Sequence, residues 1–181
     1  MPRYIAFLRA INVGGHTVKM DALRKLFEAL DFANCETFIA SGNVIFEAPD
    51  KDTQALEKSI ERHLRTALGY EVATFIRSAP QLADIAKFQP FPAELAGDGT
   101  SLYIAFLQTP PGDQAQRELM TFRTDVDDFR IHGREVYWLC RKKMSESAFS
   151  GALLEKTLGM PATLRNSTTV RKLAAIYAAS Q

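Results

Sequence analysis

The sequence predicts an α+β protein built from two tandem ferredoxin-like units, each of order βαββαβ, which are related by internal duplication and followed by one extra C-terminal helix. Two echoes between the halves indicate the duplication. The pentapeptide YIAFL occurs at residues 4–8 and again at 103–107, and LGYEVATFIRS at 68–78 is echoed by LGMPATLRNS at 158–167. Both echoes come in the same order with a glycine-led turn between them, as expected of repeated structural units.

In the first half, hydrophobic spacing predicts the elements in turn. Leu23, Leu26, Phe27 and Leu30 recur at helical intervals, and Gly42-Asn43 suits a two-residue hairpin turn between two strands. The second helix begins behind the caps Asp52 and Thr53 and is followed by the last strand. The predicted elements are a strand at about 3–10, a helix at about 20–31, strands at about 36–41 and 43–48, a helix from about 53, a strand at 72–77 and a short helix at about 79–87.

The second half repeats this order after QPFPAELAGDGT, a linker with two prolines and two glycines. The predicted elements are a strand at 101–108, a helix at 113–122, strands at 127–132 and 135–141, a helix at 150–158, a short strand at 162–164 and a C-terminal helix behind Ser167 and Thr168. The boundaries are therefore 1–88 for the first unit, 89–100 for the linker and 101–181 for the second unit with its extra helix.

The leading strands of both halves are apolar on both faces, with Tyr4, Ala6 and Leu8 on one side and Ile5 and Phe7 on the other. A ferredoxin-like unit alone would leave one sheet face in water. We therefore expect the halves to bury their open faces, against each other or under the extra helix. This argues against an RNA-recognition motif, which needs an exposed aromatic sheet face.

Composition excludes several classes of protein. The 181 residues are 46% hydrophobic and 24% charged, which is typical of a globular chain with a real core. The net charge of +1 gives no general electrostatic field that would attract DNA or an anionic membrane. The stretch from Arg141 to the C-terminus is nonetheless basic, with seven Lys or Arg and two Glu. No apolar stretch approaches the roughly 20 residues of a membrane helix, and the two cysteines lack metal-binding spacing. We expect a cytoplasmic protein with buried free thiols and no bound metal.

The stretch NVGGHTVK, at 12–19, is the first candidate site. Glycines between a strand and a helix can let backbone N–H groups converge on an anion, which Arg9 and Lys19 would complete. The spacing fits neither GxxxxGK[ST] nor GxGxxG, so a tight turn explains Gly14 and Gly15 equally simply. His16, in the same loop, is the one histidine suited to act as a general acid or ligand.

Two further segments are candidates. Ser41, Gly42 and Asn43 offer a hydroxyl and an amide, but the same residues suit a hairpin turn, and no His/Asp pair activates Ser41. LRNSTTVRK, at 164–172, places two arginines and a lysine around a helix start rich in hydroxyls, which suits either an anion or an ordinary capped helix. Asp125, Asp127 and Asp128 are interpreted as a solvated loop before a strand, not as a metal cluster.

Five segments together resemble a bacterial family called domain of unknown function 1697. The resemblance rests on FLRAINVGG, VKMDALRKLFEALDF, FIASGN, the QPFP linker and ATLRNSTTVRKL, and it spans about 4–173. It implies a two-part α+β fold and a bacterial cytosolic protein, but no established biochemical role. Two positions depart from the family pattern: Ala10 stands where Gly is usual, and Ser167 where Trp is frequent, which puts recognition of a ligand ring in doubt.

The family's recurring positions fall on the three candidate segments. The predicted ligand-binding residues are Arg9, Asn12, Gly14, Gly15, Lys19, Ser41, Asn43, Arg165, Asn166, Thr169 and Lys172. We expect an anionic or phosphorylated small ligand, bound by the 12–19 loop and the 165–172 segment. A nucleic-acid-binding protein using the basic C-terminal region and a small transferase-type enzyme are the alternatives. The sequence identifies no catalytic residue, cofactor, membrane contact or oligomeric state.

Overall fold

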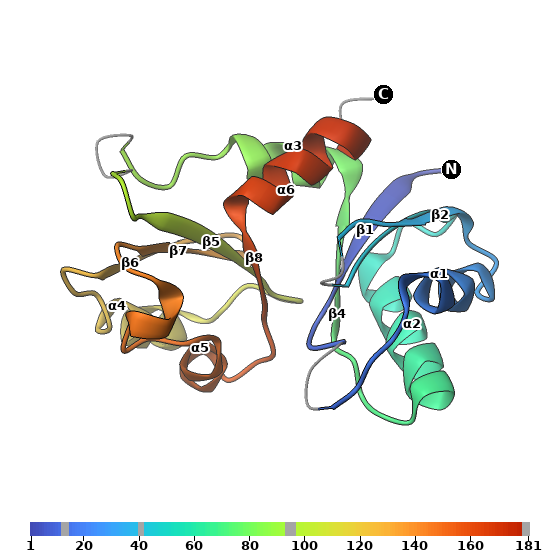
Figure 1. Ribbon diagram of the computed structural model, residues 1–181, viewed down its shortest axis with the longest axis horizontal. Helices are drawn as coiled ribbons and strands as arrows, with labels where there is room; N and C mark the ends of the chain where they lie inside the picture. The colour runs from blue at the N-terminus through green and yellow to red at the C-terminus, as the bar shows by residue number, and fades with distance from the viewer. Residues whose placement is uncertain (12–14, 40–41, 93–96, 179–181) are drawn as a thin grey trace. The chain divides into compact units, whose positions relative to one another are not determined.

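The computed structural model describes the whole chain except residues 12–14, 40–41, 93–96 and 179–181 (Figure 1). The chain divides into two compact units. The first comprises Met1–Ile85 together with the chain from Leu173, and the second comprises Ala86–Lys172. The described residues form a mixed α+β fold with two four-stranded antiparallel sheets and six α-helices. This confirms the predicted α+β class. None of the described helices is long and apolar enough to cross a membrane.

The first unit has the element order predicted for it. Its elements are β1 (Arg3–Leu8), α1 (Met20–Glu28), β2 (Ala33–Thr37), β3 (Asn43–Glu47), α2 (Thr53–Leu68), β4 (Thr74–Ser78) and α3 (Ala79–Lys87), whose last two residues fall in the second unit. The sheet order is β2-β3-β1-β4. Asp52 caps α2 by accepting hydrogen bonds from the N–H groups of Gln54 and Ala55, and the helix ends at Gly69 with φ of 83°.

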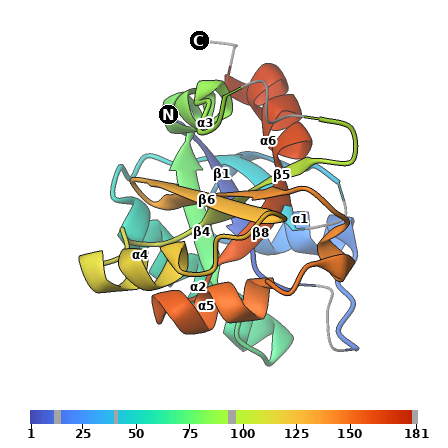
Figure 2. The same cartoon turned by 90° about the vertical axis from the view of Figure 1, so that its left-hand side faces the viewer.

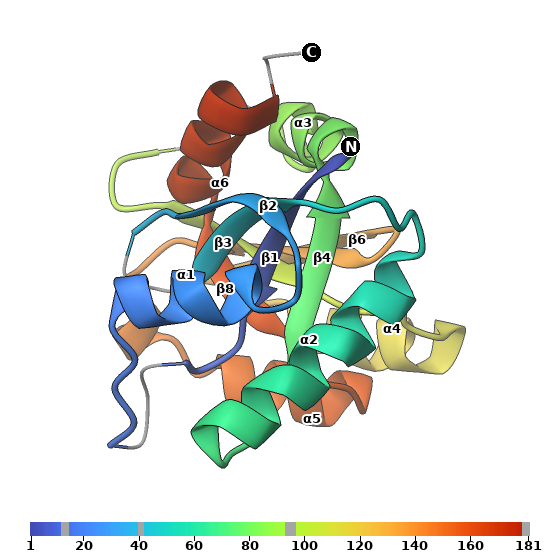
Figure 3. The same cartoon turned by 90° about the vertical axis from the view of Figure 1, so that its right-hand side faces the viewer.

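Helices α1 and α2 cover one face of this sheet (Figure 3). The core between them contains Tyr4, Ala6 and Leu8 of β1 and buried helix residues such as Phe27 and Ile60. The apolar sides of α1 and α2 thus pack against the sheet, as their helical spacing predicted.

The predicted two-residue hairpin at Gly42-Asn43 is wrong. Strand β2 ends at Thr37, Ile39 is left-handed with φ of 58°, and Asn43 is already the first residue of β3. The N–H of Phe38 donates to the carbonyl of Asn43 at 3.0 Å, so the connection between the strands is longer than two residues. Strand β2 also begins before its predicted start at residue 36, and its pairing with β3 changes register between Ala33 and Glu36.

The second unit repeats the same strand and helix order. It contains β5 (Ser101–Phe106), α4 (Asp113–Met120), β6 (Asp127–His132), β7 (Glu135–Cys140), α5 (Gly151–Leu158), β8 (Thr163–Asn166) and most of α6 (Ser167–Leu173). The sheet order is β6-β7-β5-β8. Helices α4 and α5 lie on one face of this sheet, and α6 begins on the other (Figure 2).

The C-terminal end of the chain belongs to the first unit. Helix α6 continues into a π-helical turn, Ala174–Ala178, and the chain from Leu173 groups with the first unit. The hydroxyl of Tyr177 donates to Glu36 Oε2 at 2.9 Å, and Arg3 Nη1 donates to the Tyr177 carbonyl at 3.2 Å. The division into a first unit at 1–88, a linker at 89–100 and a second unit at 101–181 remains a prediction.

The outer backbone groups of edge strands are satisfied by side chains. On β4, Glu57 Oε1 accepts from the N–H of Ile76 at 2.9 Å, and Glu61 Oε1 accepts from that of Thr74 at 3.0 Å. Arg77 turns back to donate to the carbonyl of its preceding residue at 2.9 Å. Arg130 on β6 and Arg165 on β8 make the same contact with their own preceding carbonyls, both at 2.9 Å. Such contacts oppose the pairing of another strand at these edges.

Candidate functional site

A cavity of about 370 Å³ lies on the sheet face of the second unit that faces away from α4 and α5. Its floor includes Leu102 of β5 and Leu139 of β7, and its walls come from the linker and the start of α6. The lining residues are Phe88, Gln89, Pro90, Phe91, Pro92, Thr100, Ser101, Leu102, Leu139, Asn166, Ser167, Thr168 and Arg171. This volume and mixed apolar and polar lining are typical of small-ligand sites.

Aromatic contacts fasten the linker to the sheet. The Phe88 ring stacks on His132 of β6, with centroids 4.2 Å apart and an interplanar angle of 11°, and lies 5.1 Å from the Tyr137 ring of β7. The guanidinium carbon of Arg130 lies 5.0 Å from the centroid of the Phe91 ring. The wall is therefore held by stacking and by a cation–π contact.

The opposite wall is polar. Asn166 Oδ1 accepts from the N–H of Thr168 at 2.9 Å and so shapes the turn into α6. Ser167 and Arg171 are four residues apart on this helix, which places both on the side that lines the cavity.

Ser167 and Arg171 are both available to a ligand. Ser167 is only 6% exposed, and among the described residues its hydroxyl has no hydrogen-bond partner. Arg171 is exposed and makes no hydrogen bond or ion pair within the described part of the chain. The Ser167 hydroxyl oxygen is not one of the fully enclosed, unpaired side-chain atoms of the described residues, so both it and the Arg171 guanidinium can be reached from the cavity. Together they offer a hydroxyl donor and a guanidinium to one anionic group.

The structure gives the other predicted residues of 165–172 different environments. Arg165 is buried on β8, where its Nη1 donates to Thr163 Oγ1 at 2.7 Å, and burial lowers the pKa of its guanidinium to about 10. Thr169 is half-buried and Lys172 is exposed. Of the four predicted residues in this segment, Asn166 lines the cavity, whereas Arg165, Thr169 and Lys172 are not among its lining residues.

The glycine loop belongs to the first unit, and Asn12 and Gly14 lie outside the described residues. Gly15 is exposed with φ of 83°, and Lys19 is the exposed residue that precedes α1. Arg9 is exposed, and its backbone N–H donates to the carbonyl of Ala73 at 2.9 Å. The positive φ of Gly15 accords with the turn interpretation, while the exposed cations leave anion binding open.

Tyr70 anchors the same loop. Its ring stacks on His16 with centroids 3.8 Å apart, and its hydroxyl donates to the carbonyl of Ile11 at 3.1 Å. His16 therefore has a packing role that the sequence did not reveal.

The SGN segment has a structural explanation at the positions described, since Ser41 lies outside them. Asn43 is fully buried, and its Nδ2 donates to the carbonyl of Phe38 at 2.9 Å. A Cβ on Gly42, whose φ is 80°, would lie 2.8 Å from Ile11 Cγ2. Glycine is thus needed at residue 42 both for its conformation and for its close packing.

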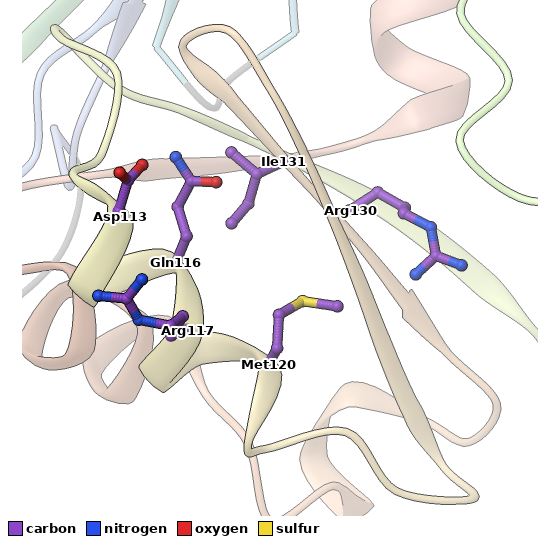
Figure 4. Close-up of a pocket in the computed structure, with 6 residues that line it drawn as sticks. All are labelled: Asp113, Gln116, Arg117, Met120, Arg130 and Ile131. Carbon is purple, nitrogen blue, oxygen red and sulfur yellow. The ribbon is translucent and has the colours of Figure 1, made fainter.

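A second hollow of about 500 Å³ lies between α4 and the edge strand β6. Figure 4 shows Gln116, Met120 and Ile131 facing it, with Arg130 on the other side of the strand. Arg117 donates to Gln114, and the carboxylate of Asp113 also lines the hollow. Its two arginines already have partners, Arg117 with Gln114 and Arg130 with Asp128, so the hollow is less suited to an anion than the cavity beside Arg171.

Asp125 is exposed in the loop before β6, as predicted, but the prediction of a solvated loop is wrong for Asp127 and Asp128. Asp127 and Asp128 are the buried first residues of β6. Asp127 accepts from Trp138 Nε1 at 2.7 Å and from Ser147 Oγ at 2.6 Å, and Asp128 pairs with Arg123 at 2.8 Å. Within the described residues, no group of three His, Cys, Asp or Glu could hold a metal ion.

Asn166 is the one lining residue that belongs to the predicted set, and the residues that were missed include Phe88, Phe91, Ser167 and Arg171. The two linker phenylalanines could have been predicted to pack against the folded part of the chain, because large apolar side chains are rarely left in solvent in a Pro-rich segment. Arg171 could have been preferred to Lys172 from helical spacing, because it lies four residues after Ser167.

Comparison with known proteins identifies the family. A family model described as protein of unknown function (DUF1697) matches residues 1–137. No curated protein matches the chain. The solved structure of a conserved bacterial protein from Streptococcus pneumoniae is similar, with a TM-score of 0.70 and 25% identity over 97% of this chain and 98% of that one. The chain therefore belongs to the DUF1697 family, as its motifs indicated.

Proposed function

We propose that this member of the DUF1697 family binds a small ligand carrying a phosphate or carboxylate group in the cavity of its second unit. One observation carries the proposal: the hydroxyl of Ser167 and the guanidinium of Arg171, neither with a partner among the described residues, line the same cavity. The surrounding walls are largely apolar, so an anion there would be partly shielded from water.

The chemistry of the polar wall suits an oxyanion. A guanidinium can donate two parallel hydrogen bonds to a phosphate or carboxylate, and such charge-assisted bonds are the stronger kind. The hydroxyls of Ser167 and Thr168 can donate one bond each. A hydrogen bond to a charged group contributes about 1.5–3 kcal/mol, so losing the Arg171 contact should weaken binding by roughly 10- to 150-fold.

We also propose an architecture for the two units and a location for the protein. The two units are duplicated ferredoxin-like modules, with sequence halves 1–88 and 101–181 joined by 89–100. Equivalent registers support this, because Arg77 pairs with Ile5 and Arg165 with Ile104 in the same strand order. The protein works in the cytoplasm, in keeping with its two buried free cysteines, Cys35 and Cys140.

The first unit contributes a second anion-binding segment in this proposal. Arg9 and Lys19, both exposed, flank the loop that contains Gly15. They are kept as ligand-binding residues, whereas of the predicted positions in 165–172 only Asn166 is kept, because it lines the cavity.

The test is a thermal-shift and calorimetric titration with inorganic phosphate, pyrophosphate, benzoate, a nucleoside monophosphate and a short RNA. At about 100 times its dissociation constant, a bound probe should raise the free energy of unfolding by about 2.7 kcal/mol. Binding should weaken in Arg171→Ala and persist in Lys172→Ala, which removes a neighbouring exposed cation outside the cavity lining. Equal loss in both variants, or binding of RNA alone with a steep salt dependence, would instead favour a nucleic-acid surface.

A further inference from the structure

We infer that the ligand of this cavity carries a flat aromatic or heteroaromatic ring beside its anionic group. This inference rests on the proposed function and specifies its ligand class. It starts from the wall opposite Arg171, which the linker builds from two phenylalanines and two prolines.

The two phenylalanine rings are positioned before any ligand arrives. Arg130 lies over one ring face of Phe91, and His132 stacks on one face of Phe88. Both phenylalanines remain half-buried, so part of each ring is still accessible. A preformed aromatic surface binds another ring without first having to order its own side chains.

The charge on Arg130 strengthens this preference. Arg130 donates to the carbonyl of Phe129 and pairs with Asp128 at 3.3 Å, so the guanidinium is held in place above the Phe91 ring. A cation over one face draws ring electron density toward itself. The rest of the ring should therefore attract an electron-rich aromatic partner more than a saturated group of similar size.

The floor and volume limit the size of the ligand. Leu102 and Leu139 give the cavity an apolar base, and its volume of about 370 Å³ is near the lower end of the range for small-ligand sites. A single ring or a fused pair with one anionic group fits this description. The polar end would meet Ser167 and Arg171, and the ring would lie along Phe91.

The sequence placed recognition of a ligand ring in doubt, because residue 167 is a serine where the family resemblance implies a tryptophan. The cavity provides aromatic side chains from another segment. The aromatic surface comes from the linker, while residue 167 supplies a hydroxyl. The two binding elements thus lie on different segments of the second unit.

The test uses three phosphate monoesters that share the same anionic group: phenyl, cyclohexyl and methyl phosphate. Their dissociation constants are measured by NMR titration on the full chain, the Phe91→Leu variant and the Phe122→Leu variant. Phe122 is a matched control because it packs against Phe149 in the helix-side core and does not line the cavity. Phe91→Leu keeps an apolar side chain and removes only the ring.

We expect phenyl phosphate to bind about 3- to 10-fold more tightly than cyclohexyl phosphate, a preference typical of ring stacking beyond simple burial. Phe91→Leu should abolish this preference, and Phe122→Leu should keep it. Equal affinities for the phenyl and cyclohexyl esters would overturn the ring inference.

An Arg171→Ala arm separates this failure from a failure of the proposed function. If the three esters bind equally and all weaken in Arg171→Ala, the anion site stands and the ring inference is wrong. If none of the three binds, or binding does not depend on Arg171, the proposed function itself is overturned.

Discussion

Ala10 adopts a backbone conformation that is unfavourable for its residue type. It occupies a left-handed conformation, with φ of 53°, in the turn that follows β1. A residue with a Cβ pays about 1–2 kcal/mol in this region, whereas glycine does not. The observed conformation therefore favours glycine at this position.

We therefore expect Ala10→Gly to raise the free energy of unfolding, by up to about 1 kcal/mol after the extra chain entropy of glycine is subtracted. Ala22→Gly is the matched control, because Ala22 is equally exposed but lies inside helix α1. There the same change should lower the free energy of unfolding by about 0.5–1 kcal/mol. Urea titration of both variants measures the two signs, and a loss of stability in Ala10→Gly would contradict the strain argument.

The edge strand β4 depends on carboxylates supplied by helix α2. Glu57 is 2% exposed although it is an acid, and its Oε1 accepts the N–H of Ile76. Glu61, one helical turn further on, accepts the N–H of Thr74. The helix thus satisfies the outer N–H groups that a second sheet partner would otherwise use.

Replacing Glu57 should therefore destabilise β4 in a way that depends on the acceptor. Glu57→Leu leaves the Ile76 N–H without this acceptor and should cost about 1–3 kcal/mol in unfolding free energy. Glu57→Gln keeps an acceptor oxygen at the same reach and should retain most of the stability. Denaturant unfolding compares the two variants, and equal losses would show that the charge of Glu57 matters more than its hydrogen bond.

The elements also show where sequence reasoning succeeds. Helix α3 and strand β6 span the residues predicted for them, because hydrophobic spacing and turn residues act locally. The error at Gly42-Asn43 arose because Ile39 adopts a left-handed conformation that no propensity suggests. The cavity could not be predicted as a whole, since Phe88 and Phe91 meet His132 and Arg130 only through tertiary packing.

At the scale of the whole molecule, the division of the chain does not follow sequence order. The residues from Leu173 belong with the first unit, and Tyr177 supplies the contacts: its hydroxyl to Glu36, its carbonyl to Arg3, and its ring against Phe38 with centroids 6.2 Å apart. Sequence similarity between halves could not reveal this, because the C-terminal turn has no counterpart in the first half.

Tyr177→Ala should consequently loosen the first unit and leave the second unchanged. Hydrogen exchange should become faster in β2 and at the start of β1, because the ring contact with Phe38 and the hydrogen bond to Glu36 are lost. Tyr103→Ala is the matched control in the second unit, where the centroid of the Tyr103 ring lies 5.4 Å from that of Trp138. It should speed exchange in β5 and β7 but not in β2. Faster exchange in β5 to β8 after Tyr177→Ala, with β2 unaffected, would mean that the C-terminal turn stabilises the second unit.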